Sequence, residues 1–312
     1  MAQRWGPGVR LWATAVACLV GGLLVTGATT PVSGGDATRV LQLNLCNSGL
    51  AGCFTGRAVD RAAAVIRAEE PDVVTLNEVC EGDLPALERA LADSGRGGGT
   101  LAAFRAAGDR RTGGAVRCRN GRPYGIGIVA RLRPDAEGST GPPQLTLGGI
   151  FPMQDVDQPE QRAWLCVGGL FDTRSARVRA LGVVKSPPNP GTAFTACTTH
   201  LASSSPAVAR AQCGYLLRWA VPAAHLGTAA VVLGGDLNLR FGGVPDGESC
   251  IPAGSRRVDD EGVQNVVTTS AFAIAARRFV DMDGTTDHPG LLVDLRGAGS
   301  SPVGGMLASV AA

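Results

Sequence analysis

The chain has 312 residues, of which 45% are hydrophobic and 18% are charged. This composition excludes a disordered chain and is sufficient for one large domain or two small ones. The formal net charge is +2, and removal of Arg4 and Arg10 leaves 27 basic against 27 acidic residues. Overall charge therefore gives no argument for a nucleic-acid ligand.

The N-terminus has the parts of a secretory signal peptide. Two arginines precede an uncharged apolar run from Leu11 to Ala28, whose last three residues are small. We predict a signal peptide over residues 1–28 and a polar linker over residues 29–38, which implies a secreted protein. The alternative is that the same run stays in place as a short membrane anchor.

Eight cysteines follow the predicted signal peptide, and an even number in an exported chain predicts up to four disulfides. They are Cys46, Cys53, Cys80, Cys118, Cys166, Cys197, Cys213 and Cys250. Eight cysteines allow 105 connectivities, and the sequence does not choose among them. Small buried thiols in a cytosolic protein are the alternative.

The first half of the mature chain begins with strands and helices in alternation. Leu41, Leu43 and Leu45 alternate with polar residues, which predicts a strand over residues 39–46. The elements predicted next are a helix over residues 57–70 that Pro71 ends, a strand over 72–79 and a helix over 83–92.

The segment over residues 97–122 is rich in glycine and arginine and has no clear hydrophobic period. Eight arginines and one acid, Asp109, lie between Arg105 and Arg133. Two interpretations remain open: a solvated loop in an arginine-biased protein, or a rim that faces phosphate groups.

The second half is dominated by strands, predicted over residues 124–131, 162–167, 193–200, 229–233, 263–268 and 291–295. The longest helix is framed by Ser205 as N-cap, Pro206 at the first helical position and Gly227 beyond its end. His225 near that end is interpreted as a helix C-terminal cation. We predict one α/β domain over residues 39–296 and a loose tail over 297–312.

Polar residues recur where the apolar strands end, which is where sheet-based enzymes place reactive groups. They are Asn44, Glu78, His200, Asp236 and Asn238, and a further pair, Asp287 and His288, precedes the last predicted strand. Carboxylate and amide oxygens suit Mg²⁺ or Mn²⁺, and histidine and amide groups can hold phosphate oxygens. The pattern indicates a divalent metal acting on a phosphate.

In this order the motifs resemble those of the endonuclease/exonuclease/phosphatase family, the DNase I-like fold. Gly235-Asp236-Leu237-Asn238 resembles the family's Gly-Asp-Phe-Asn, Thr199-His200-Leu201 its Thr-His-Leu, and Asp287-His288 its Ser-Asp-His. The resemblance spans about residues 39–296. It implies a four-layered α/β sandwich, in which two sheets pack face to face between helices.

The resemblance also implies a role for each site residue. Glu78 and Asn44 would hold the metal, Asp236 would orient the attacking water or help to hold the metal, and Asn238 and Arg162 would bind phosphate. His288, oriented by Asp287, would act as general base or stabilise the transition state, and His200 would donate hydrogen bonds to phosphate oxygens.

Two positions depart from the family pattern. Asn77 stands where the family often has Gln, and an amide stands where many members carry an Asp that supports the site. That amide is Gln264 or Asn265, depending on the register of the strand. Asp281 and Asp283 are candidates to replace the missing carboxylate.

We therefore expect a secreted, Mg²⁺- or Mn²⁺-dependent phosphoester hydrolase, monomeric and without an obligate protein partner. A phosphodiesterase acting on nucleic acid or phospholipid is the first expectation, because an exported enzyme encounters both. A phosphomonoesterase of the inositol-phosphate type is the second. A binding or toxin-like module on the same fold is the alternative from a different class, and the amide at position 264 or 265 is its only support.

Overall fold

The computed structural model describes residues 36–94, 99–132, 145–171, 174–175, 192–224, 230–244 and 246–298. The predicted signal peptide, most of the predicted linker, His225, Gly227 and the residues after 298 lie outside these ranges. Strand β1 begins at Asp36, so the last three residues of the predicted linker belong to the sheet instead.

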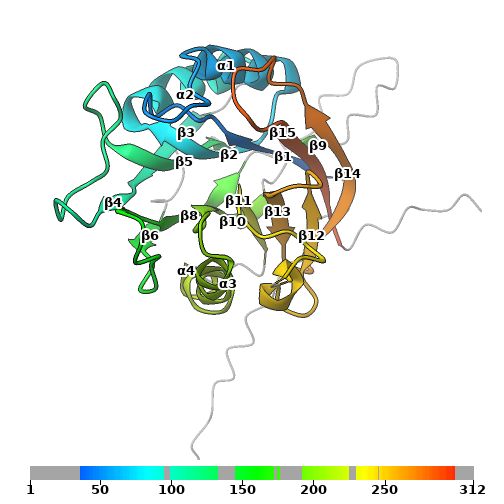
Figure 1. Cartoon of the computed structure of the whole chain (residues 1–312). Helices are drawn as coiled ribbons and strands as arrows, with labels where there is room; N and C mark the ends of the chain where they lie inside the picture. Colours follow the sequence, from blue (N-terminus) through cyan, green and yellow to red (C-terminus); the bar gives the residue numbers. More distant parts are fainter. Residues whose placement is uncertain are drawn as a thin grey trace, which may run out of the picture.

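Two sheets form the centre of the molecule (Figure 1). One has the strand order β3 (Gly99–Ala106), β5 (Tyr124–Leu132), β2 (Val73–Cys80), β1 (Asp36–Asn44), β15 (Gly290–Gly297), β14 (Phe272–Val280). The other has the order β6 (Leu145–Ile150), β8 (Ala163–Phe171), β10 (Thr192–His200), β11 (Val231–Asp236), β13 (Gln264–Thr268), β12 (Arg256–Asp259). The sheets are joined at one edge, where Leu132 pairs with Phe171.

Helices cover the outer face of each sheet, which completes the four predicted layers (Figure 1). Helices α1 (Ala58–Glu69) and α2 (Leu84–Ala92) cover the sheet that contains β1, and a short 3₁₀ turn, Glu81–Asp83, precedes α2. Helix α3 (Pro206–Tyr215), a π-helical turn (Leu216–Ala220) and α4 (Val221–Ala224) cover the other sheet. The predicted N-cap is confirmed, because Ser205 accepts the backbone N–H of Val208. A second 3₁₀ turn spans Gly247–Cys250.

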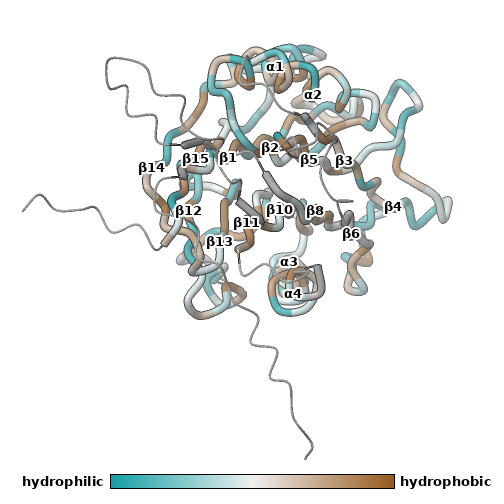
Figure 2. Tube along the Cα trace, turned by 180° about the vertical axis from the view of Figure 1, so that it is seen from behind, coloured by the Kyte–Doolittle hydropathy of each residue, from teal (hydrophilic) through white to brown (hydrophobic). Residues whose placement is uncertain are grey.

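The alternation in β1 divides its side chains between two buried faces. Leu41 and Leu43 pack under α1 and α2, whereas Val40 belongs to the core between the sheets. Gln42 and Asn44 lie on the same face as Val40, because side chains alternate along a strand. Both are buried. The polar residues of the predicted pattern therefore point between the sheets. Figure 2 shows the hydrophobic strands gathered in these central layers.

Gly234 is required by the close approach of the two sheets. A Cβ atom there would lie 2.1 Å from Thr75 Oγ1 and 3.1 Å from Gln42 Oε1, both on the opposite sheet. Any larger residue at position 234 would push the sheets apart directly behind the strand ends. The first glycine of Gly234-Gly235-Asp236 thus allows Asp236 to lie opposite β1 and β2.

All eight described cysteines form disulfides. The pairs are Cys46–Cys53, Cys80–Cys118, Cys166–Cys197 and Cys213–Cys250. Four disulfides suggest an oxidising compartment. Among the described residues, none of the helices has the length and hydropathy that a membrane span requires.

Candidate active site

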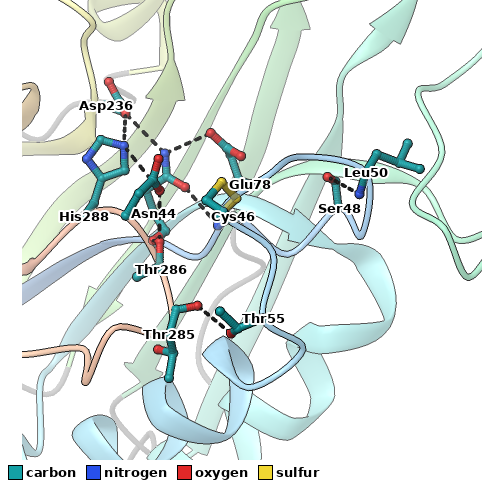
Figure 3. The surroundings of a disulfide bond; sticks show 12 residues. Asn44, Cys46, Ser48, Leu50, Thr55, Glu78, Asp236, Thr285, Thr286 and His288 are labelled. Atoms are coloured by element: carbon teal, nitrogen blue, oxygen red, sulfur yellow. Dashed lines mark hydrogen bonds and ion pairs between the residues drawn. A yellow bond between two sulfur atoms is a disulfide. The ribbon is translucent and has the colours of Figure 1, made fainter.

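Three polar side chains meet where β1, β2 and β11 end. Asn44 Nδ2 donates to Glu78 Oε1 at 3.0 Å and to Asp236 Oδ2 at 3.2 Å (Figure 3). Asn44 Oδ1 accepts the backbone N–H of Cys46 at 3.1 Å. Because both ends of the amide are engaged, Asn44 holds the two carboxylates toward one another.

Glu78 leaves its strand at a β-bulge. Its φ is 55°, and the pairing of β2 with β5 shifts register between Asn77 and Val79. A left-handed backbone costs a non-glycine residue about 1–2 kcal/mol, so the surrounding packing must maintain it. The bulge re-aims the side chain, whose exposed fraction is 19% between buried neighbours.

Besides its bond from Asn44, Asp236 forms three further hydrogen bonds, one as donor and two as acceptor, and it is only 2% exposed. Its backbone N–H donates to Asn77 Oδ1 at 2.7 Å, its Oδ1 accepts the N–H of Asn238 at 3.0 Å, and its Oδ2 accepts Gln264 Nε2 at 3.1 Å. Burial raises the pKa of Asp236 to about 6, against the lowering effects of His288 and the Asn238 N–H. Burial therefore disfavours the charged form of this carboxylate, and His288 and the hydrogen bonds from Asn238 and Asn44 partly offset that effect.

His200 is held as a neutral donor. Arg162 Nη1 lies 2.8 Å from its Nδ1, and a guanidinium can only donate, so Nδ1 is the acceptor and Nε2 carries the proton. Burial lowers the pKa of His200 well below its ordinary value, and the nearby charges of Arg162 and His288 lower it further. The Nε2 atom lies 3.9 Å from both Glu78 Oε1 and Asp236 Oδ2, so its N–H faces the site.

His288 approaches from the segment before β15. Its Nε2 lies 3.7 Å from Asp236 Oδ2 and 3.8 Å from Asp287 Oδ1. The neighbouring Thr286 hydroxyl donates to the carbonyl of Asn44 at 2.9 Å and ties this segment to β1. The Asp287 side chain is 54% exposed and beyond hydrogen-bond distance, so its orienting role stays a prediction.

The register of β13 identifies the amide that departs from the family pattern. Gln264 pairs with Asp236 across the sheet, whereas Asn265 Nδ2 donates to the carbonyl of Val263. The residue at the site is therefore Gln264. Its Oε1 accepts Gln42 Nε2 at 2.9 Å, and Gln42 Nε2 also donates to Asn77 Oδ1 at 2.7 Å. Neutral amides thus support Asp236 from behind.

Neither acidic candidate replaces the missing carboxylate. Asp283 is 59% exposed and forms an ion pair with Arg61 of α1 at 3.0 Å. The Asp281 carbonyl also accepts the Arg61 guanidinium. The Asp281 carboxylate accepts the backbone N–H of Asp283 at 2.8 Å, and the described ion pairs of His288 are with Asp236 and Asp287 instead.

The two predicted phosphate-binding residues already hold the site together. Arg162 binds Glu160 Oε1 at 2.8 Å and donates from Nη2 to Ser203 Oγ at 3.2 Å, in addition to its contact with His200. Asn238 has a left-handed backbone with φ 48°, and its Nδ2 donates to the carbonyl of Leu201 at 3.0 Å. Both residues border the group formed by Asn44, Glu78, His200 and Asp236.

Tyr124 and Glu160 belong to the site but do not stand out in the sequence. Both line a small recess together with Arg162 and His200. Burial raises the pKa of the Tyr124 hydroxyl well above its ordinary value and also raises the pKa of Glu160. The only sequence signals were a tyrosine that opens a strand and an acid two positions before an arginine, and neither is specific.

The donor set fits a divalent cation. Glu78 Oε1 and Asp236 Oδ2 share one amide donor, and the charge of Glu78 contributes to the raised pKa of Asp236. A cation between the two would relieve this repulsion, and hard carboxylate oxygens suit Mg²⁺ or Mn²⁺. Cys46, Cys53 and Asp287 also lie close together, but the disulfide occupies both sulfurs.

Several solved structures are similar in fold. An endonuclease/exonuclease/phosphatase protein from Beutenbergia cavernae DSM 12333 is 23% identical, with a TM-score of 0.56 over 85% of this chain and 72% of that chain. The human Nocturnin catalytic domain with bound sulfate anion is 13% identical, with a TM-score of 0.56 over 84% and 94%. A humanized D. rerio TDP2 is 17% identical, with a TM-score of 0.52 over 83% and 99%.

No curated protein matches the sequence. The sequence itself matches the Endonuclease/Exonuclease/phosphatase family over residues 41–259. That range contains Asn44, Glu78, Arg162, His200 and Asp236, five of the residues that the structure brings together. Members of this family are phosphoester hydrolases and generally use divalent metal ions. The chain belongs to the Endonuclease/Exonuclease/phosphatase family.

Proposed function

We propose that this protein is a secreted, Mg²⁺- or Mn²⁺-dependent phosphodiesterase. The observation that carries the proposal is the pair of carboxylates, Glu78 and Asp236, joined by Asn44 and flanked by the imidazoles of His200 and His288. This arrangement supplies oxygen ligands, a base and a neutral hydrogen-bond donor within one site. The four disulfides support export.

His288 takes the proton of the attacking water in this mechanism. The water oxygen forms the new bond to phosphorus while the bond from phosphorus to the leaving oxygen breaks, and the proton goes to the imidazole. Asp236, 3.7 Å from His288 Nε2, stabilises the imidazolium that results. Asp236 therefore supplies the negative charge that the neutral amide of Gln264 does not provide.

His200, held in place by Arg162, donates to the phosphoryl oxygens. The protonated Nε2 of His200 donates to the charge that develops on them, and its low pKa keeps it neutral at physiological pH. Arg162 fixes this tautomer from behind, and Asn238 offers its remaining amide proton. Glu78, Asp236 and the adjacent Asn44 would hold the metal ion, which when bound stabilises the negative charge of the phosphoryl group.

Two further proteins of similar fold are described with ligands or activities that involve phosphodiester groups, in line with the choice of a diester. One is D. rerio TDP2 complexed with single strand DNA product, which is 15% identical with a TM-score of 0.53. The other is ANGEL2, described as a 2',3'-cyclic phosphatase, which is 14% identical with a TM-score of 0.52. A non-catalytic module is the second candidate, because Gln264 puts an amide where a charge would assist His288.

A substrate panel tests the proposal. Plasmid DNA, RNA, sphingomyelin and inositol phosphates are incubated with the purified protein, with Mg²⁺ or with EDTA. We expect hydrolysis of at least one diester with Mg²⁺ and none with EDTA. If the folded protein hydrolyses only monoesters, the diester proposal is wrong and a phosphomonoesterase takes its place. If the folded protein hydrolyses no substrate of the panel, the result favours the non-catalytic binding module.

A further inference from the structure

The arginine-rich segment surrounds a groove beside the active site. Residues 107–123 run from β4 (Gly108–Asp109) to the start of β5, and β4 pairs with β7 (Glu160–Gln161). In Figure 1 this loop projects from the side of the molecule near β4. The groove has a volume of about 650 Å³ and is lined by Leu50, Asp109, Arg111, Val116, Arg117 and Glu160, among others.

Glu160 connects this groove to the catalytic residues. Its side chain lines the groove and also the recess that contains Tyr124, Arg162 and His200. Its Oε1 is 2.8 Å from Arg162 Nη1, which in turn is 2.8 Å from His200. A substrate bound at the active site could therefore continue past Glu160 into the groove.

Leu50 also lines the groove and lies on the Glu78 side of the active site (Figure 3). Leu50 is 69% exposed on the loop that follows β1. Figure 3 shows it beyond Glu78 and away from His288. The groove thus extends from the Glu78 side of the site.

Arg111 and Arg117 line this groove and keep guanidinium donors that no described residue uses. Arg111 is 76% exposed, and its Nε lies at the limit of hydrogen bonding, 3.5 Å, from Asp109 Oδ1. Arg117 donates to the carbonyl of Gly121 from one nitrogen and forms no ion pair among the described residues. Arg110 differs, because its guanidinium is used by the carbonyls of Asp155 and Val156. Two of the loop's arginines are therefore available to a ligand.

The composition of the groove fits a chain of phosphates with organic groups between them. Guanidinium groups bind phosphate oxygens in bidentate geometry, and Leu50 and Val116 offer apolar surface to a sugar or base. A phospholipid presents a single phosphate group to the active centre, and an inositol polyphosphate lacks apolar groups. The volume lies within the range of about 300–1,000 Å³ typical of sites for small ligands, which suits one nucleotide.

We propose that this groove binds the backbone phosphates of a nucleic-acid strand next to the nucleotide that is cleaved, with Arg111 and Arg117 each contacting one of them. The proposal rests on the proposed phosphodiesterase function and names its substrate class. It favours the interpretation of the arginine-rich segment as a rim that faces phosphate groups.

Binding without turnover gives the most direct test. The affinity of the full chain for a fluorescein-labelled dT12 strand is measured by anisotropy in EDTA at several salt concentrations. We expect the double variant Arg111→Gln/Arg117→Gln to bind about tenfold more weakly, and the slope of log affinity against log salt to fall by about 1.4, or 0.7 for each lost phosphate contact. The matched control is Arg67→Gln/Arg89→Gln on α1 and α2, which should bind within about twofold of the parent.

The outcomes separate the groove from the proposed function. Equal binding by the parent and both double variants would overturn the groove even if the parent hydrolyses diesters. Weaker binding by the groove variant alone would support it even if the parent hydrolyses no phosphoester, which would overturn the function instead. If the groove variant loses binding to phosphatidylglycerol vesicles but not to dT12, the ligand is an anionic lipid surface and the nucleic-acid proposal is wrong.

Discussion

The side-chain amide of Gln264 donates to the carboxylate oxygen of Asp236 that also faces His288. Gln264 Nε2 is 3.1 Å from Asp236 Oδ2, and His288 Nε2 is 3.7 Å from the same atom. Asn44 Nδ2 is a second donor to it at 3.2 Å. Two neutral amides therefore favour the charged form of a carboxylate that burial would otherwise protonate.

Gln264→Glu should raise the pKa of Asp236. The substitution keeps the shape of the side chain but replaces a donor with a carboxylate oxygen, so two acids would share one buried site. We expect the acidic limb of the kcat/KM profile to move up by about one pH unit or more, with lower activity at pH 7. Gln264→Met, which removes the donor without adding charge, should shift the limb less. Profiles measured between pH 5 and 9 that coincide with the parent would contradict this role of Gln264.

Asp236 should also make the metal-free protein more stable in mild acid. Its pKa is raised from 3.8 to about 6 in the folded state, so between these values the folded state binds more protons than the unfolded state. Stability therefore falls as pH rises from about 4 to 6, by up to on the order of 3 kcal/mol from this group. Urea unfolding in EDTA across this range should show the loss. Asp236→Asn should flatten the dependence, and equal slopes for both proteins would remove Asp236 as its source.

No cysteine of the mature chain should react with an alkylating reagent before reduction. Intact mass after denaturation with iodoacetamide should be unchanged, and peptide mapping should recover the four observed pairs. Removal of the Cys80–Cys118 bridge, with a sequence separation of 38, should lower the free energy of unfolding by about 4 kcal/mol. Several labelled thiols, or different pairs, would argue against the export of this protein in the observed fold.

Glu78→Gln should raise the metal concentration needed for half-maximal activity by about tenfold or more while leaving the fold intact. The carboxylate is one of two facing acids at the site, and a neutral amide holds a divalent cation far less strongly. The matched control is Glu81→Gln, an exposed residue in the adjacent 3₁₀ turn. Metal titrations of activity that coincide for parent and Glu78→Gln would remove Glu78 from the metal site.

The sequence predicted the inner framework of the fold better than its edges. The strands that carry Asn44, Glu78, His200 and Asp236 were predicted because apolar runs end in polar residues there. Strands β3 and β14 were missed. β3 lies in the glycine- and arginine-rich stretch, and five consecutive residues of β14 are exposed, so neither shows a buried period. The minor strands β4, β6, β7, β12 and β9 (Arg174–Ser175, paired with β1) were also missed.

Only those residues of the candidate site that belong to a recognisable sequence motif could be predicted. The resemblance selected Glu78, His200, Asp236 and His288, which the fold does bring together. It could not choose between Gln264 and Asn265, because a one-residue change of register turns a strand residue to the other face. Disulfide pairing and the contact of Glu160 with Arg162 depend on residues brought together by tertiary structure, which local sequence does not specify.

His288→Ala tests the account most directly, with bis(4-nitrophenyl) phosphate as substrate in Mg²⁺ and in EDTA. The parent should hydrolyse this diester only with the metal. Loss of the imidazole should lower kcat by roughly 10²–10⁴ with little change in KM, because it acts on the proton of the attacking water. Asp287→Asn, on a half-exposed side chain beyond hydrogen-bond distance, should lower kcat less than about tenfold. A His288→Ala protein that hydrolyses the diester at the parent rate, or a parent equally active in EDTA, would contradict the mechanism.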